Sequence, residues 1–148
     1  ALAYALIEKE KATVYLNEDK VNDHLISNLL EDEIEIFNYD FDGKTFSLTE
    51  NSKNGKVNSE TTFHYHQDGN LVTADYRGGD IKYGKIIADL RGDQLHMLYQ
   101  CMTIENELKA GKAIADISLT ENGKIKLNLH WEWLDGSGKK GTSEYLEN

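Results

Sequence analysis

The stretch Ile125-Lys126-Leu127-Asn128-Leu129-His130-Trp131-Glu132-Trp133 decides the fold. Apolar and polar side chains alternate strictly over these nine residues. Because successive side chains of a β-strand point to opposite faces, the alternation predicts a strand with one dry face and one wet face. A strand of this kind needs neighbours that cover its dry face, so the rest of the chain should supply them.

The same alternation recurs upstream, for example over 62–66, and turn signals such as Asn54-Gly55 and Asn122-Gly123 separate the runs. Most of the turn signals are 8–15 residues apart, which leaves no room for crossover helices and predicts an antiparallel sheet. We expect about eight strands in this part of the chain. They cover roughly 44–50, 57–67, 70–76, 80–89, 94–103, 113–119, 124–134 and 141–147.

Eight meandering strands with one dry face can form a sandwich or close into a barrel. Closure removes the exposed sheet edges, and the interior of an eight-stranded barrel holds side chains or one small ligand. Proline is absent from all 148 residues, which is consistent with long, uninterrupted strands. The sequence therefore favours a mainly β protein, an antiparallel meander closed into a calycin- or lipocalin-like barrel.

Charge divides the chain into two parts. Residues 1–42 carry three Lys and eleven Asp or Glu, a net charge of -8, whereas residues 43–148 carry a net charge of only -2. This break predicts an acidic N-terminal segment over 1–42 and a barrel domain over 43–148. The acidic segment is either a docking surface for a basic partner or a solvated, solubilising face.

The N-terminal segment has a mixed pattern. Ala1–Glu10 has a helix-forming composition but is short, and Lys11–Leu16 is a candidate strand. Leucines and a valine recur four residues apart after Asn17, which predicts a helix over about 18–31. We therefore expect a short, α-containing segment in front of the barrel.

Composition excludes several classes of protein. The net charge of -10 argues against a nucleic-acid partner, because binding to phosphates needs clustered Lys and Arg. No apolar run approaches the ~18 residues of a membrane span, so we expect no membrane partner. Ala1–Glu10 lacks the pattern of a secretory signal. The single cysteine, Cys101, excludes an internal disulfide and suits a reducing compartment, so we expect a cytoplasmic protein. We also expect no cofactor.

Five runs and three single residues carry a resemblance to a known family: Ser59–Tyr65, Gln67–Asn70, Ala74–Gly79, Leu129–Trp133 and Gly138–Ser143, with Ile81, Gly84 and Ile86. Over about residues 43–147 the chain resembles a functionally uncharacterised family of small bacterial β-barrel proteins that often carry the name N-acetylglutamate synthase. The resemblance implies a calycin-like barrel and, by that name, an acetyltransferase. The glycine-rich pieces lie between predicted strands, however, and open no helix of the kind that binds the pyrophosphate of acetyl-CoA.

The dry face of the deciding strand presents Trp131 and Trp133. They form either an aromatic wall for an apolar ligand or ordinary core filling, and both interpretations hold if the dry face lines the barrel interior. Arg77 precedes the glycines of a loop tip, where it either meets an anionic head group at the barrel mouth or serves only the turn. The predicted ligand contacts are Tyr65, Tyr76, Arg77, Tyr99, Trp131 and Trp133.

Histidines suggest a weaker hypothesis, a metal site. His64 and His66 share one strand face with Cα atoms roughly 6.5–7 Å apart, and His96, His130 or Glu132 could supply further ligands. The alternative is a wet strand face with solvated histidines, so we predict no metal and keep His64, His66 and His130 as weak candidates. His130 and Glu132 also lack a neighbouring nucleophile, and we predict no catalytic residue.

Three functions remain open. The first is a non-enzymatic barrel that binds a small, partly apolar or anionic ligand, and the second is an interaction module that docks through residues 1–42. The third is the acetyltransferase that the family name implies. The binding barrel ranks first because the alternating strands and the aromatic wall come without a catalytic constellation. The sequence leaves open the identity of the ligand and whether the chain forms a homodimer.

Overall fold

A computed structural model describes residues 3–8, 11–16, 35–37 and 39–148 of the chain. The chain divides into two compact units, Ala1–Asp40 and Phe41–Asn148. Each unit is described by itself below. The boundary lies two residues before the charge break in the sequence.

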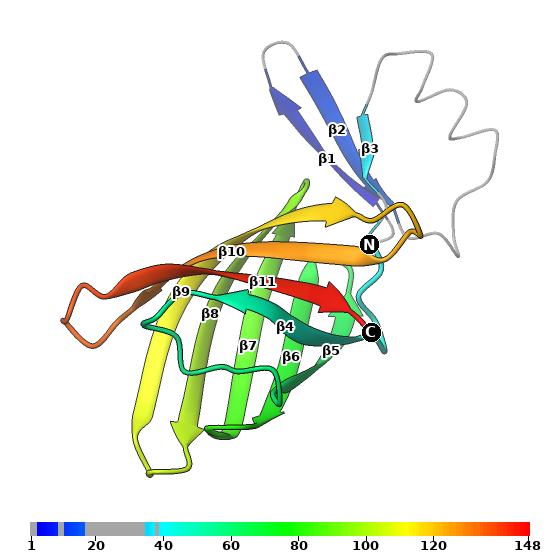
Figure 1. The fold of residues 1–148 in the computed structure, drawn as a ribbon. Coiled ribbons are helices and arrows are strands. Elements are labelled where there is room, and N and C mark those ends of the chain that lie inside the picture. Colours follow the sequence, from blue (N-terminus) through cyan, green and yellow to red (C-terminus); the bar gives the residue numbers. More distant parts are fainter. Residues whose placement is uncertain (1–2, 9–10, 17–34, 38) are drawn as a thin grey trace. The chain divides into compact units, whose positions relative to one another are not determined.

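The first unit contains a three-stranded sheet in the order β1-β2-β3 (Figure 1). β1 (Ala3–Glu8) pairs antiparallel with β2 (Lys11–Leu16), and β2 pairs parallel with β3 (Glu35–Phe37). β2 is the candidate strand of the sequence, whereas β1 forms where the composition favours a helix. Pairing with β2 along its whole length explains this, because an isolated helix of this length is marginal. The predicted helix over 18–31 lies outside the described residues.

The second unit is a closed barrel of eight antiparallel strands in the order β10-β11-β4-β5-β6-β7-β8-β9 (Figure 1). Each strand pairs with its neighbour in sequence, and the last strand closes the circle against the first. The predicted meander and its closure into a barrel are confirmed. The strands are β4 (Thr45–Asn51), β5 (Thr62–Asp68), β6 (Leu71–Gly78), β7 (Ile81–Arg91), β8 (Gln94–Thr103), β9 (Leu108–Leu119), β10 (Ile125–Trp133) and β11 (Lys140–Glu147).

Two strand boundaries differ from the prediction by more than two residues. β5 begins at Thr62 and not at residue 57, because the residues before it form hydrogen bonds through side chains. The Asn58 side chain accepts a hydrogen bond from the Glu60 amide at 2.9 Å, and the Thr61 hydroxyl donates one to the Gly78 carbonyl at 2.9 Å. β9 begins at Leu108, five residues early, because a tight turn lets it pair with β8 up to Met102.

The alternation of β10 is realised in the barrel wall. Its apolar residues, from Ile125 to Trp133, are all buried inside the barrel, and the polar residues between them are exposed or half-buried. Neighbouring strands present their own alternating apolar residues to the same interior. The core of the second unit is therefore the inside of the barrel.

One end of the barrel is filled. The Phe41 ring is fully buried there, with its centroid 5.9 Å from that of Phe46 and 5.6 Å from that of Tyr65. The Phe41 amide donates a hydrogen bond to the Gln67 side chain at 2.8 Å, which holds the segment across the opening. Leu95 and Leu127 are completely buried in the same unit. Because this end is closed by packed side chains, any internal space must lie toward the other end of the barrel.

The wall is weakest where β4 meets β5. β4 pairs with β5 through only three residue pairs, from Thr45 with His64 to Ser47 with Thr62. Beyond Ser47, β4 continues along β11 alone, with a register shift between Glu144 and Tyr145. The connection over 52–61, which we call the gate loop, spans the gap that β4 and β5 leave.

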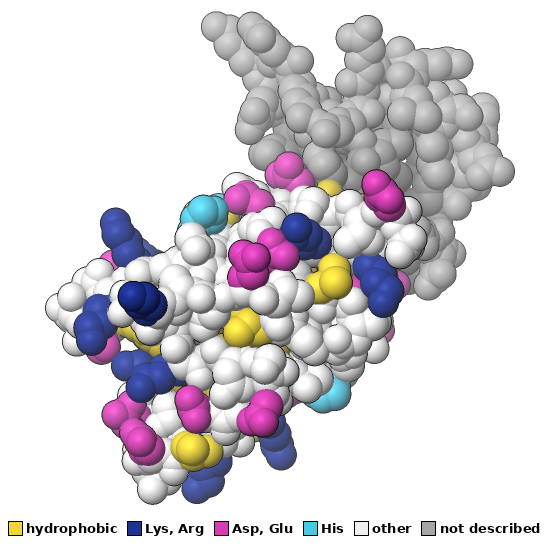
Figure 2. Space-filling view, viewed as in Figure 1, with side chains coloured by type: hydrophobic (Ala, Val, Ile, Leu, Met, Phe, Trp, Pro, Cys, Tyr) yellow, Lys and Arg dark blue, Asp and Glu magenta, His cyan; other side chains and the backbone are white. Residues whose placement is uncertain are grey.

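Charges of both signs are interspersed over the face of the second unit that Figure 2 shows, and apolar side chains appear there only in small groups. Exposed apolar side chains on the barrel include Ile87 and Leu98, which are cross-strand partners on β7 and β8. Within the described residues, no helix has the length and apolar character needed to cross a membrane.

Candidate ligand-binding cavity

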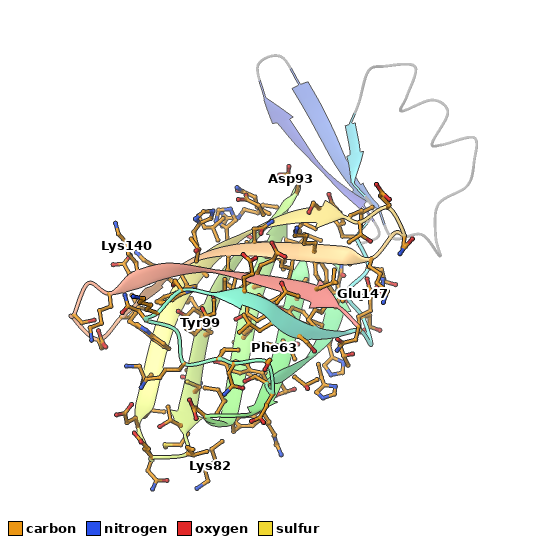
Figure 3. The ribbon with its side chains drawn as sticks, in the orientation of Figure 1. Phe63, Lys82, Asp93, Tyr99, Lys140 and Glu147 are labelled. Carbon is orange, nitrogen blue, oxygen red and sulfur yellow. The ribbon has the colours of Figure 1, made fainter. Side chains whose placement is uncertain are left out.

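A cavity of about 50 Å³ lies inside the barrel, toward the end opposite Phe41. Its wall is mostly aromatic and apolar. Figure 3 labels two of its residues, Phe63 on β5 and Tyr99 on β8, and marks the two ends of the barrel with Lys82 and Asp93. The lining comprises Asn51, Gly55, Lys56, Val57, Phe63, Tyr76, Ile81, Ile86, Met97, Tyr99, Cys101, Leu129, Trp131, Trp133, Ser143 and Tyr145.

Glycines of neighbouring strands make room for rings of the cavity wall, including those of two tyrosines. Tyr76 faces Gly84 across the β6–β7 pair, and Tyr99 faces Gly111 across the β8–β9 pair. A Cβ atom on either glycine would overlap the ring of its tyrosine. Each ring therefore lies flat against the wall over a glycine, an arrangement that strands use when a ring replaces a missing side chain. The flat rings leave open the space between them.

The remaining rings form the rest of the wall. The Trp131 and Trp133 centroids are 5.9 Å apart at an interplanar angle of 59°, and Tyr99 meets Trp133 edge-on at 5.6 Å. Phe63 stacks on Tyr76 at 4.7 Å. These distances lie within the range of favourable aromatic pairs, so the wall is held together by ring contacts.

Hydrogen bonds connect the polar groups of the wall in a chain. The Trp131 indole N–H donates to Ser143 Oγ at 2.8 Å, and the Ser143 hydroxyl donates to Asn51 Oδ1 at 2.6 Å. The Asn51 amide then donates to the Val57 carbonyl of the gate loop at 2.8 Å. No buried side-chain nitrogen or oxygen among the described residues lacks a hydrogen-bond partner. This series of hydrogen bonds therefore pairs the polar groups of the wall without using a charged residue, and it links the wall to the gate loop.

Lys56 is the only charged residue among the described residues that line the cavity. Burial raises the pKa of Tyr76, Tyr99 and Tyr145 above the ordinary value for tyrosine, and burial likewise raises the pKa of the Cys101 thiol. All four groups are therefore protonated at neutral pH. A ligand in the cavity would meet rings, hydroxyls and a thiol.

Charges lie at the rim and are paired. Lys109 Nζ lies 4.6 Å from the centre of the Trp133 ring and 3.5 Å from an Asp135 carboxylate oxygen. Hydrogen bonds from Ser137, with Lys109 nearby, lower the pKa of Asp135 to about 2. Lys56 Nζ lies 3.8 Å from a Glu107 carboxylate oxygen. Both rim lysines thus already have a carboxylate partner.

The structure brings four of the predicted ligand contacts into this cavity: Tyr76, Tyr99, Trp131 and Trp133. It does not place the other two there. Tyr65 is buried, but its ring packs on Phe41 and Phe46 toward the closed end. Arg77 lies on the outer face with its guanidinium 4.9 Å from the centre of the Tyr83 ring. Their roles in binding stay predictions.

The three candidate metal ligands are not brought together. His64 and His66 face outward on β5, and His130 faces outward on β10, with β4 and β11 between the two strands. His130 Nε2 lies 3.6 Å from an Asp116 carboxylate oxygen. Over residues 3–8, 11–16, 35–37 and 39–148, no group of three or more His, Cys, Asp or Glu residues is arranged to hold a metal ion.

The cavity residues that were not predicted from the sequence include Phe63, Tyr145, Ser143 and Asn51. Alternation could have found three of them, because Phe63 lies two residues before Tyr65, and Ser143 and Tyr145 lie two residues apart on β11. Asn51 carried no such signal, since its position depends on where β4 ends and the gate loop begins.

A family model described as "Avidin-like protein" matches residues 39–148. Neither the curated proteins nor the solved structures contain a match to the chain. The match covers the whole barrel unit and confirms that the sequence resembles a β-barrel family, but it carries nothing about the name N-acetylglutamate synthase. With its closed eight-stranded meander and its matched residues spanning most of its length, the chain belongs to the family of avidin-like proteins.

Proposed function

We propose that the barrel binds a small, uncharged, ring-bearing molecule in its cavity and does not transform it. The observation that carries the proposal is the cavity wall, in which aromatic rings surround a few neutral, hydrogen-bonded polar groups. Sites for small molecules have this composition, mostly apolar and aromatic with a small number of placed polar groups. Membership in the avidin-like family supports a barrel that binds a small ligand.

The charges favour an uncharged ligand over an anionic one. An anionic group would meet two cations, Lys56 in the cavity lining and Lys109 beside the Trp133 ring. Such a group would have to compete with Glu107 and Asp135 for them. Inside the cavity, an anion would lose its hydration without gaining a partner charge that is not already paired, which is costly. The proposal therefore places a neutral ring inside.

The two tryptophans provide a direct test, because they are the only tryptophans in the chain and both line the cavity. The probe is 4-nitrobenzyl alcohol, a flat, uncharged aromatic with one hydroxyl and a nitro group that quenches tryptophan fluorescence. We expect saturable quenching in the wild-type protein. Native and then denaturing mass spectrometry of the purified protein would give the mass of any resident ligand.

A matched pair of substitutions at one cavity position supplies the control. Cys101→Ser keeps the volume of the side chain, whereas Cys101→Leu fills part of the cavity. We expect the serine variant to bind the probe as the wild type does. The leucine variant should bind it about tenfold more weakly, the equivalent of a modest overpacking cost. Equal affinities in the two variants would place the probe elsewhere and contradict the proposal.

A further inference from the structure

We infer that the gate loop, residues 52–61, moves aside to let the ligand enter the cavity. The inference rests on the proposed function and adds how access to that site is controlled. Its first support is the barrel wall itself, because β4 and β5 separate after only three residue pairs. The gate loop lies over the gap.

The cavity is too small for a ring while the gate loop stays in place. A space of about 50 Å³ holds a few water molecules, since each water needs roughly 10–15 Å³ by the same measure. An engineered apolar cavity that binds benzene has a volume of about 150 Å³. A ring-sized ligand therefore requires part of the wall to move.

The gate loop is the part of the wall best able to move. Gly55, Lys56 and Val57 line the cavity, and no other described lining residue belongs to a connection between strands. All remaining lining residues lie on strands. Asn51 and Phe63 border the gap itself, and the others lie on strands that are hydrogen-bonded to a neighbouring strand on both sides. Moving those strands would break the barrel, whereas moving the loop would not.

The loop is firmly attached at its ends and lightly in its middle. At one end the Ser52 amide donates to the Thr142 carbonyl at 3.0 Å, and at the other the Thr61 hydroxyl donates to the Gly78 carbonyl. Between these ends, the Trp133 indole N–H reaches the Asn54 carbonyl at 3.3 Å, a long hydrogen bond. The Lys56–Glu107 ion pair is half-exposed and spans 3.8 Å, so it contributes little.

The strongest contact to the middle of the loop comes from Asn51. Its side-chain amide donates to the Val57 carbonyl at 2.8 Å, while its Oδ1 accepts from Ser143. Asn51→Asp keeps the acceptor for Ser143 and removes the donor to Val57, so it releases the loop without removing the side chain. Asn70 offers a matched control at the closed end, where its amide donates to Asp89 Oδ1 at 2.7 Å.

The test is stopped-flow quenching of tryptophan fluorescence by 4-nitrobenzyl alcohol in the wild type, Asn51→Asp and Asn70→Asp. We expect Asn51→Asp to raise both the association and the dissociation rate constants by about fivefold, the equivalent of one hydrogen bond. Asn70→Asp should leave both rates unchanged. Glu107→Gln, which alters no lining residue, should raise both rates by a smaller factor and serves if Asn51→Asp does not fold.

The outcomes separate the two proposals. Binding with the same rates in the wild type, Asn51→Asp and Glu107→Gln would overturn the gate and leave the binding function intact. A rise in the dissociation rate alone would also overturn the gate, because it indicates a lost contact with the probe and not easier access. Binding of the probe to the Asn51→Asp variant but not to the wild type would support the inference that the gate loop controls access. Absence of quenching in every variant would overturn the binding function and, with it, the gate.

Discussion

At the scale of single residues, the cavity depends on pairs of a ring and a glycine. Tyr76 over Gly84 and Tyr99 over Gly111 keep two large side chains against the wall. Without the glycines, the same rings would have to turn inward and occupy the space where a ligand is proposed to lie. The glycines thus determine whether the aromatic interior is hollow or filled.

We predict that Gly84→Ala weakens binding of 4-nitrobenzyl alcohol about tenfold and lowers the free energy of unfolding by about 1–3 kcal/mol, as overpacking does. The added Cβ pushes the Tyr76 ring into the cavity. Tyr76→Leu in the same background should recover part of both losses. Fluorescence titration and urea denaturation would measure the two effects. Strict additivity of the two substitutions would contradict a contact between the ring and the glycine.

Four buried or half-buried tyrosines predict a loss of stability in alkali. Burial raises the pKa of Tyr65, Tyr76, Tyr99 and Tyr145 in the folded barrel, whereas the unfolded chain titrates at about 10. Their contribution is therefore fully present below pH about 10 and is lost as the pH rises, because the unfolded state releases its protons first. Denaturation by urea from pH 8 to pH 11 should show this fall. A free energy of unfolding that stays constant above pH 10 would contradict it.

At the scale of elements, the segment before β4 and the gate loop after it have opposite roles. Phe41 seals one end through contacts with Phe46 and Tyr65, and the gate loop covers the other. The closed end is packed with fully buried apolar side chains, while the gate loop is held in its middle by few contacts. We therefore expect the barrel to be rigid at one end and adaptable at the other.

We predict that Phe41→Ala lowers the free energy of unfolding by about 3–5 kcal/mol, the usual cost of removing a buried phenylalanine ring. Phe41→Leu should cost less because it refills part of the space. Affinity for 4-nitrobenzyl alcohol should stay unchanged in whichever variant remains folded, since Phe41 does not line the cavity. Chemical denaturation and fluorescence titration would measure both. A substitution at Phe41 that weakens binding would show that the two ends are not independent.

The elements also show what alternation can and cannot predict. It gives the face of each residue, so Trp131 and Trp133 were placed inward correctly. By the same rule Arg77, next to the inward-facing Tyr76, belongs on the outer wall, and the structure places it there. Alternation gives no height along the barrel axis. Tyr65 therefore shares the inward face with Phe63 but packs toward the closed end.

At the scale of the whole molecule, the barrel was predictable because local and global signals agree. Alternating strands, turn residues between them and short connections all require an antiparallel meander, and closure follows from the cost of two free edges. The cavity was not predictable to the same degree. Its volume depends on how rings, glycines and the gate loop fit together, which no single segment encodes. A cytoplasmic location and a docking role for residues 1–42 stay predictions.

The most direct test of the central claim is a two-dimensional nitrogen–proton NMR titration of the labelled protein with 4-nitrobenzyl alcohol. The chain has two tryptophans, so two indole N–H signals report on the cavity wall. We predict that both indole signals shift saturably, while the amide signals of Leu95 and Leu127 at the closed end do not. Shifts confined to outward-facing residues such as Leu98, or no shift of either indole, would contradict a ligand-binding cavity inside the barrel.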